Sequence, residues 1–308
     1  MTIVFKVSDN IREKMIEYYM DKRKEKTPPY AVFQAVEADT VVTLYESGKV
    51  MFQGISADID ANMWKDQEKF LNNIDVDTRT TEEKKESMID KSNYYYSAIG
   101  SDEVGTGDYF LPIVVTACFM DKVNIKFLES LKVHDSKKLT DKKILSVAPL
   151  IMKKIPYESI ILSNKEYNEW VNKGINMNKV KAIMHNKMLF KMKSKGFNYD
   201  KIIVDQFCLP GVYYNYLREI KDKVTGITFM TKAEDKNLSV ACASIISRYI
   251  FLKEQEKLEK SLGILIPKGA GIKVDETGKE LVKSKGKDVL NEISKISFKN
   301  TDRILNND

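Results

Sequence analysis

The chain has 308 residues, of which 43% are hydrophobic and 31% charged, so it can build a sizeable core and is neither collagen-like nor wholly disordered. It has no run of about 18 apolar residues, and charge comes too early at the N-terminus for a secretory signal, so we expect no membrane span. Three widely spaced cysteines without a CxxC pair argue against a disulfide framework or a zinc ribbon and make the cytoplasm the expected location.

The net charge of +6 is unevenly distributed along the chain. Residues 1–70 hold 10 Lys/Arg and 12 Asp/Glu, whereas residues 94–308 hold 36 and 26. A basic excess in the C-terminal two-thirds suits a polyanionic partner such as nucleic acid. A lysine-rich composition alone can produce the same excess, so charge suggests this partner without establishing it.

The N-terminal part is predicted to be a small α+β domain over residues 1–71. Thr27-Pro28-Pro29 should end its first helix, because proline cannot supply the backbone donor that a helix needs. Residues 72–93 lose the apolar rhythm and are predicted to be a linker. The expected strands cover 2–7, 31–38, 40–45 and 49–53, and the expected helices cover 9–26 and 57–71.

The second domain, residues 94–308, alternates predicted strands with predicted helices. This pattern favours an α/β fold in which helices pack on a mostly buried central sheet. The expected strands cover 96–101, 112–120 and 201–205, and the expected helices cover 141–155, 179–195 and 239–260.

Acidic residues stand where two of these predicted strands end. Asp102 and Glu103 follow the strand 96–101, and Asp205 ends the buried run 201–205. Alternation would send the side chains of Asp102 and Glu103 to opposite sides of an ideal strand, but a turn at the strand end would let both reach one ion. An acid at the end of a buried strand is costly unless it is paired or bound to a metal.

A third acidic pair, Glu234 and Asp235, precedes a predicted helix rich in small residues. Hard cations such as Mg²⁺ take oxygen ligands, and two such ions can clamp an in-line phosphoryl displacement. The only histidines, His134 and His185, are expected at packing or surface positions, so no Ser–His or Cys–His arrangement competes. No P-loop motif is present either. The sequence therefore predicts a metal-dependent site for phosphoryl chemistry.

The ordered motifs resemble those of ribonuclease HIII, a bacterial member of the type 2 ribonuclease H group. SDEVGTGDYF (101–110) is similar to its opening active-site motif, and VHDSKKLTD (133–141) to its lysine-bearing segment. VDQF (204–207) is similar to its third acidic strand, and TKAEDKNLSVACASIISR (231–248) to its final acid-plus-helix motif. Residues 27–54 resemble its N-terminal substrate-binding domain, whose fold is related to the TATA-binding protein. The resemblance covers nearly the whole chain.

The resemblance implies an RNase H-like catalytic domain with a mixed central sheet. It also implies that this domain hydrolyses the RNA strand of RNA–DNA hybrids with Mg²⁺ or Mn²⁺. The products would carry 5′-phosphate and 3′-hydroxyl ends. By position, the metal-binding acids are Asp102, Glu103 and Asp205. The fourth catalytic acid matches Glu234, with the adjacent Asp235 as the alternative. No protein partner is implied, and we expect a monomer.

The same resemblance assigns substrate contacts. Gly105, Thr106 and Gly107 match the loop whose backbone reads ribose 2′-hydroxyls, the group that distinguishes RNA from DNA. Lys137 and Lys138 match residues expected near the scissile phosphate. Three positions depart from the family pattern, namely Leu111 in place of glycine, Ser247 in place of alanine and Ser297 in place of histidine.

Two other functions stay open at this point. A ribonuclease HII-like enzyme would incise at single ribonucleotides in duplex DNA, which a substrate with one embedded ribonucleotide would reveal. A non-catalytic nucleic-acid-binding protein would work through its N-terminal domain, by a flat sheet face and the basic residues Lys22, Arg23, Lys24 and Lys26. The acids at every expected position argue against the second alternative, since a binding module has no use for carboxylates near phosphates.

Overall fold

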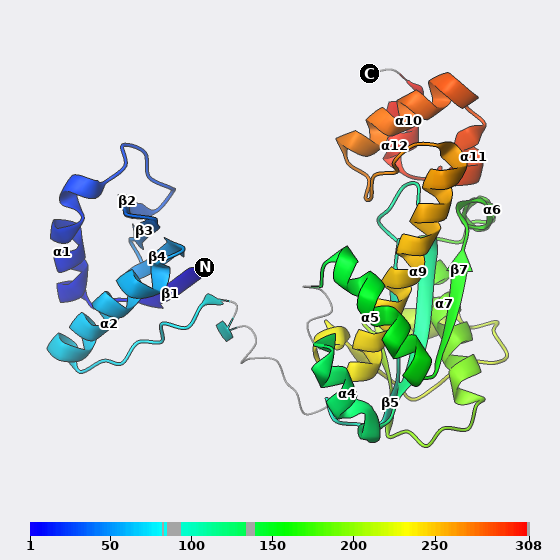
Figure 1. Ribbon diagram of the computed structural model, residues 1–308, viewed down its shortest axis with the longest axis horizontal. Helices are drawn as coiled ribbons and strands as arrows, with labels where there is room; N and C mark the ends of the chain where they lie inside the picture. Colours follow the sequence, from blue (N-terminus) through cyan, green and yellow to red (C-terminus); the bar gives the residue numbers. More distant parts are fainter. Residues whose placement is uncertain (82, 85–93, 134–138, 307–308) are drawn as a thin grey trace. The chain divides into compact units, whose positions relative to one another are not determined.

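A computed structural model describes residues 1–81, 83–84, 94–133 and 139–306 (Figure 1). The chain divides into two compact units, Met1–Ile89 and Asp90–Asp308. Two residues expected near the scissile phosphate, Lys137 and Lys138, lie outside the described residues. Within the described ranges, no helix has both the length and the apolar character needed to cross a membrane.

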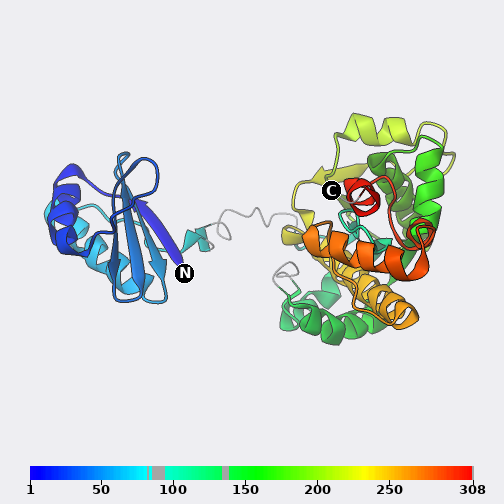
Figure 2. The same ribbon diagram turned by 90° about the horizontal axis from the view of Figure 1, so that it is seen from above.

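The N-terminal unit is a four-stranded antiparallel sheet, in the order β1-β4-β3-β2, with the helices Asp9–Tyr18 and Ala57–Asn72 on one face (Figure 2). Alternate strand residues such as Phe33 and Phe52 are buried in one cluster with Trp64, whereas no described helix covers the other face of the sheet, which carries the exposed Lys6 and Lys49. The elements are β1 (Thr2–Lys6), α1 (Asp9–Tyr18), η1 (Met20–Lys22), β2 (Ala31–Glu37), β3 (Thr40–Tyr45), β4 (Lys49–Gly54) and α2 (Ala57–Asn72).

The first helix ends earlier than the sequence predicts. Its C-terminal neighbour Tyr19 is fully buried, and the Tyr19 hydroxyl accepts a hydrogen bond of 3.0 Å from the Trp64 indole nitrogen. The backbone N–H of Lys24 then donates to the carbonyl of Gln34 in β2, at 2.7 Å. The prediction of one helix over 9–26 is therefore wrong, because the chain turns into the core and continues beside β2.

The segment after α2 starts by following the N-terminal unit. Thr80 forms an isolated antiparallel bridge with Ile3 of β1. The Lys84 ammonium group donates to the backbone carbonyl of Val4, at 2.7 Å. Of the segment predicted as a linker, Asp75 and Thr78 contact α2, whereas Thr80 and Lys84 lie along the edge of β1.

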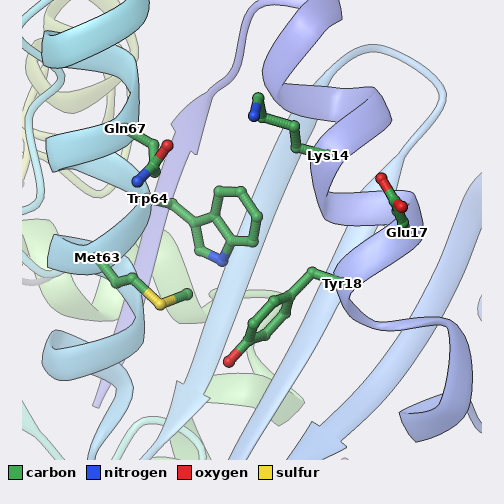
Figure 3. A pocket seen from close by; sticks show the side chains of 6 residues that line it. All are labelled: Lys14, Glu17, Tyr18, Met63, Trp64 and Gln67. Carbon is green, nitrogen blue, oxygen red and sulfur yellow. The ribbon is translucent and has the colours of Figure 1, made fainter.

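A groove of about 420 Å³ lies between α1 and α2 (Figure 3). The rings of Tyr18 and Trp64 meet edge to face there, with centroids 5.6 Å apart. Only one acid lines the groove, so it does not provide the set of oxygen ligands that a hard cation takes. The lining residues are Lys14, Glu17, Tyr18, Met63, Trp64 and Gln67.

The second unit is built on a mixed five-stranded sheet, in the order β7-β6-β5-β8-β9. The β5–β6 and β6–β7 pairs are antiparallel, whereas the β5–β8 and β8–β9 pairs are parallel. The predicted α/β fold with a mixed sheet is confirmed. The strands are β5 (Ala98–Val104), β6 (Ile113–Met120), β7 (Tyr157–Leu162), β8 (Lys201–Asp205) and β9 (Ile227–Met230).

Helices cover both faces of this sheet. On one face, Cys118 of β6 packs with Ile144 of α5 and Ala241 of α9. On the other face, Ala117 of β6 packs with Met188 of α7. The layered arrangement therefore places α5 and α9 opposite α7 across the sheet. The helices of this part are η2 (Lys122–Asn124), α4 (Ile125–Ser130), α5 (Asp141–Lys154), α6 (Asn164–Asn172), α7 (Met177–Lys193), α8 (Pro210–Tyr216), η4 (Ala233–Asp235) and α9 (Leu238–Leu262).

The last three helices gather at the C-terminal end of α9 (Figure 1). They enclose a separate core that includes Tyr109, Phe110 and Leu111. The buried Lys295 ammonium group donates to the backbone carbonyls of Asp108 and Leu111, so this region holds the chain just after the glycine loop. The sequence analysis predicted no elements here. They are α10 (Ile272–Lys285), α11 (Val289–Ile293) and α12 (Lys299–Leu305).

Candidate active site

The first two acids lie inside β5 and not after it. Glu103 pairs with Val115 of β6 in the antiparallel ladder, and the strand continues to Val104. The prediction of a strand end before Asp102 is wrong, because pairing with β6 extends past both acids. Successive strand residues face opposite sides, so Asp102 points toward α9 and Glu103 toward α7.

β5 and α9 approach each other closely because Gly100 has no side chain. A Cβ atom at Gly100 would lie 2.3 Å from the hydroxyl of Ser239 in α9. This approach brings the Ser244 hydroxyl near the Asp102 carboxylate, where it acts to lower the pKa of that group. Ser247, which replaces the expected alanine, donates to the backbone carbonyl of Asp102 at 3.2 Å. Small and hydroxyl-bearing residues of α9 therefore form the wall behind Asp102.

Asp205 lies beside Asp102 on the same face of the sheet. β5 and β8 run parallel with Ser101 opposite Val204, so the next residues along each strand, Asp102 and Asp205, are neighbours. Asp205 Oδ1 accepts a hydrogen bond of 2.9 Å from the backbone N–H of Ala233, the first residue of η4. The structure thus brings Asp102, Asp205 and the third acidic segment to one edge of the sheet.

The two candidates for the fourth acid differ in burial. Glu234 is fully buried, whereas Asp235 is partly exposed. Both belong to η4, whose first residue bonds to Asp205. A metal ion next to that contact would stabilise a buried carboxylate more than an exposed one, because water does not solvate the buried charge. This favours Glu234 over Asp235, and the assignment stays a prediction.

The Glu103 carboxylate is held from α7 by two side chains. Lys181 Nζ lies 2.5 Å from Glu103 Oε1, and His185 Nε2 lies 2.8 Å from Glu103 Oε2. Burial alone would raise the pKa of Glu103, but the His185 hydrogen bond and the positive charge of Lys181 outweigh it and lower that pKa. Sequence reasoning did not include Lys181 and His185 among the site residues.

Ser101, His185 and Glu103 form a hydrogen-bonded chain like that of a serine hydrolase, which the sequence analysis did not foresee. Ser101 Oγ lies 2.8 Å from His185 Nδ1, and the other ring nitrogen contacts Glu103. Ser101 and His185 are both 0% exposed, so the hydroxyl cannot reach a substrate. The expected packing position of His185 is confirmed, and nucleophilic catalysis by Ser101 is excluded.

The acidic groups suit a divalent cation. Burial, followed by the carboxylates of Glu103 and Asp205, raises the pKa of Asp102, because each opposes its negative charge. A bound cation would offset the negative charges of these carboxylates. Carboxylate oxygens are ligands that Mg²⁺ and Mn²⁺ prefer. Among the residues described, however, no three His, Cys, Asp or Glu side chains lie close enough to hold an ion. The ligand set Asp102, Glu103 and Asp205 therefore stays a prediction.

The glycine loop 105–107 leaves β5 in a conformation that requires glycine. Gly105 has φ +90°, and a Cβ atom there would lie 2.0 Å from the carbonyl oxygen of Pro112. Asp108 Oδ1 accepts a hydrogen bond of 2.6 Å from the backbone N–H of Gly269, which ties the loop to the segment before α10. Gly107 is exposed, so a polar group of a ligand can approach its backbone.

The other two departures from the family pattern lie away from the acids. Leu111 is fully buried in the C-terminal core. The Ser297 hydroxyl lies 3.1 Å from the hydroxyl of Tyr167 in α6. Leu111 therefore packs in the core of the second unit, and Ser297 is exposed on that unit beside α6.

Comparison with known proteins identifies the chain's relatives. The family described as Ribonuclease HII matches residues 99–301, and a domain of unknown function (DUF3378) matches residues 2–74. The chain is 38% identical over 308 residues to Ribonuclease HIII of Geobacillus kaustophilus, covering 98% of this chain and 97% of that protein. It is 38% identical over 312 residues to Ribonuclease HIII of Bacillus subtilis, covering 97% and 96%.

A solved structure agrees with these relatives. The crystal structure of Bst-RNase HIII in complex with Mn²⁺ matches with a TM-score of 0.70 and 35% sequence identity, covering 99% of this chain and 98% of that one. The match includes both units, and the sequence relatives are likewise similar from end to end. The chain therefore belongs to the ribonuclease HIII family.

Proposed function

We propose that the chain is a metal-dependent endoribonuclease that hydrolyses the RNA strand of RNA–DNA hybrids. The observation that carries the proposal is the adjacent placement of Asp102 and Asp205 at the end of two parallel strands, in a chain of the ribonuclease HIII family. The relative Bst-RNase HIII was crystallised with Mn²⁺, which supports Mn²⁺ or Mg²⁺ as the ion here.

Asp102, Glu103 and Asp205 would hold the ions, and Glu234 would add the fourth carboxylate. When bound, such ions supply Lewis-acid activation and neutralise charge on the phosphate. The chain's own residues bring the carboxylates to one edge of the sheet and shield Asp102 beneath α9. Water attacks phosphorus and the bond to the 3′-oxygen breaks, which leaves a 5′-phosphate and a 3′-hydroxyl.

Substrate recognition in the second unit would use the glycine loop. The exposed backbone at Gly107 follows the acids of β5 directly, so it can meet the ribose next to the scissile phosphate. A contact to the ribose 2′-hydroxyl would distinguish RNA from DNA at that position. Lys137 and Lys138 are proposed to bind near the phosphate, a role that rests on their place in the motif alone.

The open sheet face of the N-terminal unit supports a role in hybrid binding. Lys6 of β1 and Lys49 of β4 are direct cross-strand partners and both are exposed. Like charges placed opposite each other are destabilising, and a phosphate backbone would relieve them. The basic residues at 22–26 are less available for hybrid binding than the sequence predicts. Lys22 pairs with Glu37 at 2.6 Å, and Arg23 donates a hydrogen bond to a backbone carbonyl of α1.

The protein is further proposed to act as a cytoplasmic monomer without a required protein partner. One copy of the chain forms each of the two proposed sites. These are the sheet edge with Asp102 and Asp205, and the open sheet face with Lys6 and Lys49. Light scattering during size-exclusion chromatography should give the mass of a single chain, 35.4 kDa. A stable dimer would refute this part of the proposal.

A substrate panel tests the proposed reaction. The protein is incubated with a labelled RNA–DNA hybrid, single-stranded RNA, duplex DNA and duplex DNA with one embedded ribonucleotide, each with Mg²⁺, Mn²⁺ or EDTA. We expect metal-dependent cutting of the RNA strand in the continuous hybrid. Preference for the embedded ribonucleotide would instead support a ribonuclease HII-like activity, which the match of residues 99–301 makes the second candidate.

A further inference from the structure

Each oxygen of the Glu103 carboxylate contacts a different donor from α7. Lys181 Nζ lies 2.5 Å from Oε1 and His185 Nε2 lies 2.8 Å from Oε2. The side chains of Lys181 and Glu103 are 11% and 12% exposed, and that of His185 is fully buried. Solvent therefore competes little with these contacts.

The two donors are themselves fixed in place. The second ring nitrogen of His185 contacts Ser101 Oγ at 2.8 Å, and its ring stacks on Phe207 with centroids 5.4 Å apart. The Lys181 ammonium group lies 4.0 Å from the centroid of the same Phe207 ring. Phe207 follows β8 by two residues, so the arrangement joins α7 to the ends of both acid-bearing strands.

Glu103 needs such a support more than the other acids do. Strand alternation directs its side chain away from the face that carries Asp102 and Asp205. A free glutamate has several rotatable bonds, and ordering it on metal binding would cost side-chain entropy. Each carboxylate oxygen has two lone pairs, so a Glu103 oxygen that contacts Lys181 or His185 can still bind an ion.

We propose that Lys181 and His185 are positioning residues that hold the Glu103 carboxylate in the orientation needed for metal binding. The proposal rests on the proposed function, because it takes Glu103 as a metal ligand. Outer contacts of this kind orient the ligand and tune the ion, and their loss typically costs about 10–100-fold in metal affinity or activity. Lys181 also places one positive charge against the Glu103 carboxylate, which stabilises its charged form before an ion arrives.

The test uses the full-length chain with His185→Phe and Lys181→Met. Phenylalanine keeps the ring that stacks on Phe207 but removes both nitrogen contacts. His185→Gln and Lys181→Arg are conservative variants that can still donate to Glu103. Lys187→Met, an exposed lysine of the same helix outside this network, is the matched control.

Two measurements are compared across the variants. Titration calorimetry gives the Mn²⁺ affinity of the metal-free protein, and steady-state cleavage gives kcat and KM for the hybrid. We expect His185→Phe to weaken Mn²⁺ binding about 10–100-fold and to lower kcat, with KM within about twofold of the unsubstituted chain. Lys181→Met should lower kcat in the same way, and His185→Gln and Lys181→Arg should recover most of each loss.

The outcomes separate this inference from the proposed function. Unchanged Mn²⁺ affinity in a folded His185→Phe protein would overturn the positioning role, even if the chain cuts hybrids. Should that variant fail to fold by circular dichroism, Lys181→Met and Ser101→Ala decide by the same titration, because each removes one contact of the network. Mn²⁺ affinities of both equal to that of Lys187→Met would overturn the role. Weakened Mn²⁺ binding in a chain that never cuts hybrids would support the positioning role and refute the proposed function.

Discussion

At the scale of single residues, the face of the strand decides the surroundings of each acid. Asp102 faces α9, and burial together with the carboxylates of Glu103 and Asp205 raises its pKa. Glu103, one residue later, faces α7 and meets Lys181 and His185, which lower its pKa. Two adjacent carboxylates in one strand therefore have opposite electrostatic environments.

The acids were predictable from the sequence, but the residues around Glu103 were not. Asp102, Glu103 and Asp205 stand out because acids are unusual at the ends of apolar runs. His185 lies 82 residues from Glu103 in the chain, and only the packing of α7 on β5 brings them together. A single sequence does not show which helix covers which strand, so Lys181 and His185 were missed.

Gly105→Ala should destabilise the protein. The residue has φ +90°, and the added Cβ atom would lie 2.0 Å from the carbonyl of Pro112. We expect a loss of about 1–3 kcal/mol in the free energy of unfolding, measured by urea titration. Gly107→Ala is the control, because no atom lies within 4 Å of its added Cβ. Equal stability of the two variants would contradict the argument.

Lys295 should give the protein a pH-dependent stability. Burial, only partly offset by Asp108, lowers the pKa of Lys295 from 10.5 to about 7. Between these values the unfolded chain binds one more proton than the folded chain, so the free energy of unfolding rises with pH from about 7 to 10.5. Below about pH 7 both states are protonated, and this contribution no longer changes with pH. Lys295→Met should remove this rise, measured by urea unfolding at pH 7, 8 and 9.

The control for this experiment is Lys299→Met, which replaces an exposed lysine at the start of α12. That variant should keep the pH dependence of the unsubstituted chain. The same slope of unfolding free energy against pH in Lys295→Met would show that the buried ammonium group does not titrate in this window.

At the scale of elements, periodicity predicted where strands and helices lie better than where they end. Strands 31–38, 40–45 and 49–53 match β2, β3 and β4 closely. The strand predicted over 96–101 runs instead to Val104, because its partner β6 continues the ladder past the two acids. Pairing across strands is a long-range effect, and local pattern cannot show how far it extends.

The open face of the N-terminal sheet carries a prediction of its own. Lys6→Gln together with Lys49→Gln should raise KM for the hybrid several-fold and leave kcat unchanged, because both lysines are exposed on the strands and far from the chemistry in sequence. The salt dependence of binding should also weaken by about one unit of slope per lysine. Lys14→Gln, on the helix-covered face, should change neither quantity. Unchanged KM and salt dependence in the double variant would argue against this face as the binding surface.

At the scale of the whole molecule, the chain combines two compact units with different surfaces. The first unit offers an open sheet face with paired lysines, and the second offers an acidic edge at the ends of β5 and β8. Family membership extends over both units, since the relatives are similar from end to end. The sequence motifs predict substrate binding for the first unit and catalysis for the second. The C-terminal helices around Lys295, which hold the chain just after the glycine loop, carried no recognisable sequence signal.

The most direct measurement is the rate at which Asp102→Asn cuts a labelled RNA–DNA hybrid at saturating Mn²⁺, relative to the unsubstituted chain. Asparagine keeps the shape of the side chain but removes the charge that an ion would bind. We predict a fall in the single-turnover rate of about a thousandfold or more, with hybrid affinity and thermal stability nearly unchanged. Cleavage by Asp102→Asn at the rate of the unsubstituted chain would contradict the assignment of this edge as the active site.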